Sequence, residues 1–383
     1  MTNTGRQSHF LRFLENTSNF TWRKQQLIKE GKPDIVISPD ELYDNALHLI
    51  AKLCAIGYMV VGMKDRSTAK AVVAMDGKQS EIGASNGRTG KTLIGDLLKH
   101  ATPAIYINGK TVDLEGDKFV WDELTEKHRT VVIDDLRQGF NIEMLFTNIT
   151  GDWNVNYKGG RRCTFPFTTS PKIYLATNHT LRGEGSSFLD RQWVIAFSDF
   201  YNDKHKPTDD FGLMFFDEWD FEQWNLTWNL LAECVQLYFR YGCIQSPQER
   251  IEVRRLRQNM GEEFLIWAEE YFSDNNKRNT RQPRKELYDA FLEHSPNQRK
   301  YCTTTAFKTK IQSYCKWKGY TFNPHKYDPI TGIPFQIDKD GQPVVDDKSG
   351  GVEYFTIGDD SFASPGADDL GILAQPITTK PPF

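Results

Sequence analysis

Residues 84–92 read ASNGRTGKT, and a segment with a helical pattern, Thr92–His100, follows them. A loop that wraps a phosphate needs glycine, because its backbone N–H groups must turn inward around the anion. It also needs a lysine that reaches the terminal phosphates and a hydroxyl that holds Mg²⁺. Gly90, Lys91 and Thr92 supply this ending, and the helix after them would direct its positive N-terminus at the phosphates. The stretch therefore predicts a phosphate-binding loop.

The loop departs from the GxxxxGK[ST] pattern at one position. Ser85 stands where the first glycine is expected, although Gly83 and Gly87 lie nearby. The short polar run Ser80–Ile82 is predicted as the strand that enters the loop. A Gly-rich surface turn is the alternative interpretation. The residues expected to bind nucleotide are Ser85, Asn86, Gly87, Arg88, Thr89, Gly90, Lys91 and Thr92.

A second motif, Thr130–Asp135, reads TVVIDD, an apolar strand that ends in two carboxylates. In ATPases that combine such a phosphate-binding loop with an acid-tipped strand, the first acid orients Mg²⁺ and the second polarises the attacking water. We therefore expect Thr92 and Asp134 to hold the metal and Asp135 to act on the water. The distance along the chain leaves room for a helix, a strand and a helix, which predicts that the acid strand lies beside the phosphate loop in a doubly wound sheet.

Short apolar strands alternate with helical patterns over residues 80–200. The predicted strands are Ala104–Asn108, Thr130–Asp135, Lys172–Asn178 and Trp193–Phe197, and the predicted helices are Thr92–His100 and Leu114–His128. This alternation favours an α/β fold with a mostly parallel sheet. Asn178 ends the third strand, where its amide could contact the γ-phosphate and the attacking water; a simple turn former is the alternative.

Gly151–Phe167 reads GDWNVNYKGGRRCTFPF, with β-prone arms on both sides of two glycines. This pattern is typical of a hairpin. Aromatic side chains stack on bases and cations hold phosphates, so the hairpin is a candidate contact for single-stranded nucleic acid. A solvated basic turn is the alternative. The candidate residues are Tyr157, Lys158, Arg161 and Arg162.

The flanking regions are predicted more coarsely. Residues 1–57 form a helical region, in which Ser38–Glu41 is a capping box and Gly57 ends the helix. The runs YMVVGM and AVVAM that follow are expected to pair as a hairpin. Residues 206–274 are again helical. Residues 283–358 combine two helices and a hairpin, as in a winged-helix-like module, and residues 359–383 form a tail that composition predicts to be disordered.

The winged-helix-like module is locally basic, although the chain as a whole is not. Its lysines lie on or near the second helix, where either a recognition helix or a solvated helix face would carry them. These lysines are Lys308, Lys310, Lys316 and Lys318.

The composition of the 383 residues is that of a globular protein of two or three domains, with 39% hydrophobic and 26% charged residues. The net charge of −4 argues against a wholly basic nucleic-acid coat protein. No apolar run approaches the length of a membrane span, and the N-terminus lacks the apolar core of a signal peptide. The six cysteines form no CxxC, which predicts reduced thiols in a cytoplasmic protein without a zinc site.

Five segments, in order, resemble the Walker A, Walker B, B′, sensor 1 and arginine-finger segments of superfamily 3 helicases of the AAA+ class. The closest resemblance is to the helicase part of phage, plasmid and poxvirus-type primase-helicases, over roughly residues 80–200. Asp135 departs from the commoner glutamate. The segments are ASNGRTGKT, VVIDDL, ITGDWNVNYKGGRRCTFPF, SPKIYLATN and FLDRQWVIAFSDFY.

The resemblance implies an ATP-driven, Mg²⁺-dependent hexameric ring that translocates on single-stranded or forked DNA during phage or mobile-element replication. A separate primase or initiator is a further expected partner, because the first 57 residues lack an acidic metal-binding motif. Arg191 would act in trans on the neighbouring subunit's ATP, with Arg182 as a rival and a salt bridge to Asp190 or Glu184 as the alternative. The other function open to the sequence is a P-loop switch or scaffold without motor activity.

Overall fold

The computed structural model describes residues 8–32, 35–77, 88–137, 139–160, 162–179, 181, 186–247, 256, 259–327, 334–337 and 353–359. The chain divides into two compact units, Met1–Arg254 and Arg255–Phe383, with separate hydrophobic cores. None of the described helices combines the length and the apolar character needed to cross a membrane. All six cysteines lie among the described residues and are free thiols, as the sequence predicts.

A parallel sheet forms the centre of the first unit. Among the described residues its strand order is β2-β3-β6-β1-β7, and every neighbouring pair runs parallel. β1 and β6 are buried along their whole length, which agrees with their mostly apolar composition. The predicted α/β fold with a mostly parallel sheet is thus confirmed. The strands are β1 (Ala71–Asp76), β2 (Ala104–Asn108), β3 (Thr130–Asp134), β6 (Lys172–Thr177) and β7 (Gln192–Phe197).

In the sheet β6 separates β3, the acid strand, from β1, the strand that precedes the predicted phosphate loop in sequence. The end of the acid strand nevertheless lies beside the loop, as predicted, since Thr92 contacts Asp134. Because all five strands run parallel, their carboxyl ends still meet at one edge of the sheet. This edge is where open α/β sheets bind ligands.

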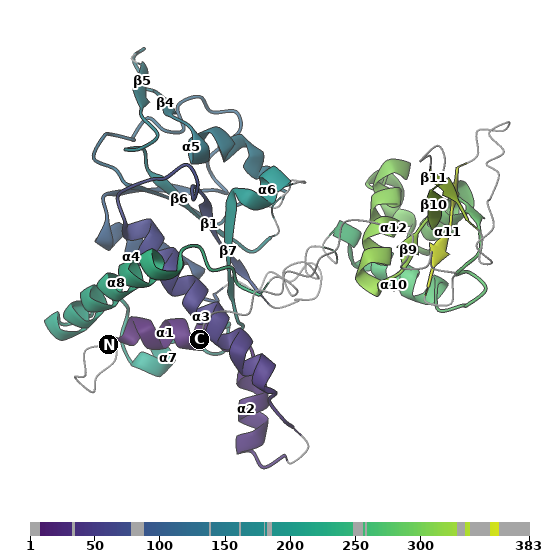
Figure 1. The fold of residues 1–383 in the computed structure, drawn as a ribbon, viewed down its shortest axis with the longest axis horizontal. Helices are drawn as coiled ribbons and strands as arrows, with labels where there is room; N and C mark the ends of the chain where they lie inside the picture. Colours follow the sequence, from purple (N-terminus) through teal and green to yellow (C-terminus); the bar gives the residue numbers. More distant parts are fainter. Residues whose placement is uncertain are drawn as a thin grey trace. The chain divides into compact units, whose positions relative to one another are not determined.

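Helices cover one face of the sheet (Figure 1). Val72 and Ala74 of β1 pack against these helices, whereas Val73 and Met75 point to the opposite face. That opposite face is covered by the segment between β2 and β3, by η1 (Ile142–Leu145) and by α5 (Phe146–Thr150). The covering helices are α1 (His9–Ser18), α3 (Pro39–Val60), α4 (Lys91–Ala101) and α8 (Phe221–Tyr241); α2 (Trp22–Lys29) lies between α1 and α3 in sequence.

Helix α3 confirms the predicted start and corrects the predicted end. The Ser38 hydroxyl accepts a hydrogen bond from the Glu41 amide at 3.2 Å, and the Glu41 carboxylate accepts one from the Ser38 amide at 3.1 Å. The helix continues past Gly57 to Val60, so the predicted hairpin of YMVVGM with AVVAM is wrong. A short buried apolar run cannot be assigned to helix or strand from its periodicity, and Tyr58 and Met59 are buried.

Gly57 permits the close approach of two helices. A Cβ at this position would lie 2.0 Å from the carbonyl oxygen of Cys234, in the backbone of α8. The absence of a side chain therefore allows α3 and α8 to pack against each other. The glycine that the sequence marks as a helix end is instead a packing position inside the helix.

The segment after β2 also differs from its prediction. Leu114–His128 forms successive turns and not a helix. Asp113 accepts hydrogen bonds from the amides of Glu115 and Gly116, and Asp117 accepts one from the amide of Phe119. Such aspartate turns compete with the helical hydrogen-bond pattern.

The predicted hairpin within Gly151–Phe167 is confirmed. β4 (Trp153–Asn156) pairs antiparallel with β5 (Arg162–Phe165). Gly159 and Gly160 have φ of 104° and 93°, a backbone conformation that favours glycine. The hairpin projects away from α1, α3 and α8 (Figure 1).

The second unit contains the two helices predicted for the basic module, α11 (Arg284–His294) and α12 (Thr304–Lys318), preceded by α10 (Glu262–Tyr271). Phe307 and Ile311 of α12 are buried in its aromatic core. Its identity as a winged helix stays a prediction, and residues 360–383 of the predicted tail lie outside the described residues. Short antiparallel pairs join β8 (Gln282–Pro283) to β12 (Tyr354–Phe355), β9 (Thr321–Phe322) to β13 (Ile357–Gly358) and β10 (His325–Tyr327) to β11 (Pro334–Gln336).

Replacing Gly57 with alanine should destabilise the first unit. The intrinsic gain in helix propensity is about 1 kcal/mol. Forcing a methyl group against the α8 backbone costs more, so we expect a net loss of about 2 kcal/mol. Thermal unfolding should show a decrease in Tm of about 4–8 °C. Gly62→Ala is the control, because a Cβ there lies 3.9 Å from its nearest neighbour; equal Tm values for the two variants would contradict this account of Gly57.

Candidate functional site

The described part of the phosphate loop begins at Arg88; Ser85, Asn86 and Gly87 lie outside the described residues. Gly90 is the N-cap of α4 and has a φ of 93°. A Cβ there would also lie 2.6 Å from the Phe13 ring of α1. Both the backbone angle and the close approach therefore require glycine. Lys91 and Thr92 form the first turn of α4, as the sequence predicts.

The Lys91 ammonium forms an ion pair with Asp76, the last residue of β1. Thr89 joins them, since its hydroxyl donates to Asp76 Oδ1 at 2.6 Å and accepts from Lys91 Nζ at 3.0 Å. Asp76 is only 2% exposed. The sequence analysis does not include Asp76, because it predicts that Ser80–Ile82, which lies outside the described residues, enters the loop as a strand. The run AVVAMD (71–76), apolar and ending in an acid, carried the better signal.

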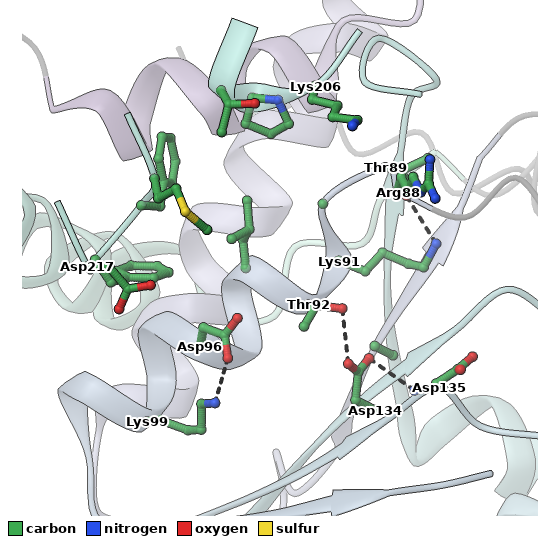
Figure 2. Close-up of a pocket in the computed structure, with 18 of the residues that line it drawn as sticks. Arg88, Thr89, Lys91, Thr92, Asp96, Lys99, Asp134, Asp135, Lys206 and Asp217 are labelled. Atoms are coloured by element: carbon green, nitrogen blue, oxygen red, sulfur yellow. Dashed lines mark hydrogen bonds and ion pairs between the residues drawn. The ribbon is translucent and has the colours of Figure 1, made fainter. Parts of the chain in front are cut away.

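Thr92 and Asp134 meet at the carboxyl edge of the sheet (Figure 2). Thr92 Oγ1 donates to Asp134 Oδ2 at 3.0 Å, and the hydroxyl of Tyr106 donates to the same oxygen at 2.7 Å. Asp134 Oδ1 accepts from the Asp135 amide at 3.0 Å. Hydroxyl and carboxylate oxygens are the donors that Mg²⁺ prefers, so this pair fits the predicted metal.

Tyr106 is a second residue that the motifs did not indicate. Partial burial and its hydrogen bond to Asp134 both raise the pKa of its phenol, so it remains a donor to the carboxylate at neutral pH. It lies in β2, at the far edge of the sheet from β1. Nothing in the local sequence of β2 shows that one of its side chains reaches the tip of β3.

Asp135 adopts a φ of 55°, a left-handed conformation that is uncommon outside glycine. Its carboxylate forms an ion pair with Lys110 Nζ at 2.5 Å. Lys110 lies two residues after the end of β2, and the sequence motifs did not indicate it either. Strained backbone held by its surroundings is concentrated at functional sites.

Asn178 follows β6 and lies on the same cavity as the loop and both acids. The cavity has a volume of about 900 Å³. It therefore unites the residues from β3, α4 and β6 that the sequence assigned to one site. Its other walls come from the C-terminal half of α4 and from Lys206–Asp217, a segment that the motifs did not include.

The predicted DNA-contact residues lie away from this cavity, on the hairpin. Tyr157 is half-buried and donates to the Leu124 carbonyl at 2.6 Å, so it anchors the hairpin to the segment after β2. Lys158 is 75% exposed and pairs with Asp122 at 3.1 Å, a contact that raises the pKa of the lysine. Arg162 is exposed and donates to Asn156 at 3.0 Å. Arg161 lies outside the described residues.

Arg191 lies at the opposite end of the sheet from the cavity. It directly precedes β7, and its carbonyl accepts from the amide of Ala71, the first residue of β1. Its guanidinium lies over the ring of Phe146 at 4.7 Å and donates to the Ser187 carbonyl at 3.0 Å. Arg182 and Glu184, its predicted rival and its alternative partner, lie outside the described residues.

The lysines of α12 are largely engaged within their own unit. Lys308 pairs with Glu353 at 2.7 Å and Lys318 pairs with Glu269 at 2.8 Å. Lys310 donates to the Met260 carbonyl. These contacts favour a structural use of the three lysines over the alternative of a recognition helix.

No protein-family model matches the chain, and no curated protein matches it. An apo structure of the C-terminal region of NrS-1 is similar, at 14% identity and a TM-score of 0.40, covering 82% of this chain and 75% of that one. A second apo structure of that region has 15% identity and a TM-score of 0.35, and the match covers 83% of this chain and 64% of that one. A JCV helicase with a bound small molecule has 13% identity and a TM-score of 0.27, covering 64% of each chain. These TM-scores are low, so function has to be inferred from the geometry of the pocket.

Proposed function

We propose that this protein is an ATP-dependent DNA helicase of the AAA+ superfamily 3 type. It would act in the cytoplasm as a homo-hexameric ring on single-stranded or forked DNA, in the replication of a phage or mobile element, with a separate primase or initiator as a partner. The observation that carries the proposal is the meeting of Lys91, Thr92, Asp134, Asp135 and Asn178 on one cavity. Positioning and charge stabilisation are what phosphoryl transfer requires of a protein.

Each residue has a distinct task in this proposal. Lys91 exchanges Asp76 for the terminal phosphates and neutralises their charge. Thr92 and Asp134 hold Mg²⁺, which, when bound, neutralises charge that develops on the phosphate oxygens. Asp135 accepts a hydrogen bond from the attacking water after it leaves Lys110, and Asn178 orients the same water.

One segment of the chain contacts both the acid edge and the hairpin, as a motor would require. Lys110, the partner of Asp135, begins the segment that braces the hairpin. Within this segment Trp121 packs edge-on against Trp153 of β4, with 4.9 Å between the ring centroids. The Leu124 carbonyl accepts a hydrogen bond from the Tyr157 hydroxyl. A movement of the acid edge on hydrolysis can therefore reach the hairpin through packed side chains.

The position of Arg191 supports a ring. Each strand advances about 3.3 Å per residue, so the six residues of β7 separate Arg191 from the carboxyl edge by about 20 Å. The guanidinium cannot span that distance to its own cavity. In a head-to-tail ring it would face the cavity of the next subunit and stabilise charge there.

The first prediction concerns the nucleotide site. Asp134→Asn should reduce ATP turnover by about 10²-fold or more, because the amide no longer orients the metal. Lys91→Ala should do likewise, but it also leaves Asp76 buried without its lysine, so Tm must be measured alongside turnover. Single-stranded DNA should stimulate the wild-type rate. Lys29→Ala, an exposed change on α2, is the control. Normal turnover in Asp134→Asn would contradict the site, and nucleotide-dependent partner capture without DNA stimulation would favour the switch.

The second prediction concerns the hairpin. Lys158→Ala should preserve basal ATP hydrolysis but reduce DNA-stimulated hydrolysis and unwinding, because it removes an exposed cation from the hairpin. Asp122→Asn should have the opposite effect and increase the affinity for DNA, since Asp122 competes with the DNA phosphates for Lys158. The readouts are forked-DNA unwinding and binding of a labelled oligonucleotide. Unwinding at the wild-type rate by Lys158→Ala would show that this residue is not part of the translocating element.

The third prediction is complementation between subunits. Arg191→Ala should reduce turnover by roughly 10³-fold, and Asp134→Asn should be equally inactive. Rings mixed from the two variants should regain part of the ATPase activity, because some interfaces pair an intact Asp134 with an intact Arg191. Subunit exchange is verified with two affinity tags. If verified mixed rings stay inactive, or if Arg191→Ala is active by itself, Arg191 does not act in trans.

A further inference from the structure

The cavity is longer than a phosphate site requires. Thr92, Asp96 and His100 line it at successive turns of one face of α4. An α-helix rises about 1.5 Å per residue, so the cavity follows α4 for about 13 Å from Lys91 to His100. Figure 2 shows Asp96 and Asp217 toward the end of the cavity that is remote from Lys91 and Asp134. An extended nucleoside triphosphate has a comparable length.

One wall of the cavity is apolar and is formed by Leu213, Met214, Phe215 and Phe216. These four residues follow α7 (Pro207–Phe211), whose C-cap is Gly212. Phe216 packs against His100 near the C-terminal end of α4, and Asp96, Lys99 and Asp217 are polar residues that also line the cavity. Small-molecule sites are lined mainly by apolar side chains with few polar groups.

The apolar wall is held in a fixed shape. The Met214 amide donates to the Glu218 carboxylate at 2.6 Å, and the Glu218 amide donates to the Met214 carbonyl at 3.2 Å. Phe216 has a φ of 71°, which is strained for a bulky residue. Its ring packs against the rings of His100 in α4 and Trp219, with centroid separations of 5.2 Å and 4.8 Å. The surrounding contacts therefore maintain a conformation that the residue would not adopt by itself.

Met214 is the most exposed residue of this wall. It is 56% exposed, whereas Leu213 is half-buried and Phe215 and Phe216 are buried. Methionine is polarizable and unbranched, and it packs well against flat aromatic rings. Burial of its side chain by a ligand would be worth about a tenfold change in affinity or more.

We propose that the cavity wall formed by Leu213, Met214 and Phe216 is the base subsite for a nucleoside triphosphate, with the base against Met214 and the triphosphate at Lys91. This inference rests on the proposed function, which requires a nucleotide but does not say what holds its base. Contact by apolar side chains favours the larger ring of a purine over a pyrimidine. It also discriminates weakly between purines, since apolar pockets reject similar ligands only modestly.

The test compares a nucleotide with its phosphates alone. A ribose-labelled fluorescent ATP gives the dissociation constant for the nucleotide, and competition by inorganic tripolyphosphate gives the value for the phosphates. Met214→Ala and the uncharged, similarly long Met214→Gln remove the apolar contact without altering the loop. Leu189→Ala is the matched control, because Leu189 is 61% exposed and lies on α6 (Ser186–Asp190), outside the residues that line the cavity.

We expect both Met214 variants to weaken the binding of ATP and GTP about tenfold and the binding of CTP less. The affinity for tripolyphosphate should not change. An unchanged ATP affinity would overturn the inference, as would equal losses for ATP and tripolyphosphate, because the effect would then lie in the phosphate loop. A wild-type protein that binds ATP no better than tripolyphosphate would also overturn it while leaving the phosphate site intact. Only a wild type that binds neither ligand would contradict the proposed function itself.

A photoreactive ATP with an azide on the purine gives a second measurement. Cross-linking followed by peptide mapping should label the peptide that contains Leu213–Phe216, and Met214→Ala should reduce that labelling. Labelling confined to other peptides would place the base elsewhere and overturn the inference.

Discussion

The site depends on the parallel register of β1, β6 and β3. Because these strands run in one direction, the chain leaves each of them at the same edge of the sheet, and Asp76, Asn178 and Asp134 come together there. The hydrogen bond from Thr92 to Asp134 then joins the first turn of α4 to the tip of β3, across the intervening β6. The two cores that cover β1 and β6 keep that register, since a slip of one residue would exchange side chains of different size between two packed faces.

Local patterns predicted the strand tips because each tip carries its own signal. An apolar run that ends in an acid or an amide identifies β3 and β6, and a GKT triplet identifies the start of α4. The order of the strands carries no such signal, so the position of β6 between β1 and β3 could not be predicted. Gly57 shows the same limit: its role depends on the Cys234 backbone, which lies 177 residues away in sequence.

The missed residues are those that supply opposite charge or a hydrogen bond to a predicted one. Asp76 pairs with Lys91, Lys110 pairs with Asp135, and Asp122 pairs with Lys158. Such partners have no fixed spacing from the motif, so a single sequence does not reveal them. Their energetic weights differ, because an exposed pair such as Lys158–Asp122 contributes about 1 kcal/mol or less, whereas breaking a buried pair by loss of one partner is far more costly.

This difference in burial bears on how the proposed motor would be regulated. Phosphate can displace Asp122 from Lys158 at little cost, so DNA engagement at the hairpin is easily reversible, as translocation requires. Displacing Asp76 from Lys91 is more costly, because Asp76 is buried at the end of β1. A ligand that does so must offer Lys91 more negative charge than Asp76 does, as a triphosphate does and a single phosphate does to a lesser degree, while Asp76 keeps its hydrogen bond from Thr89. The buried pair thus favours occupation of the site by a nucleoside triphosphate over smaller anions.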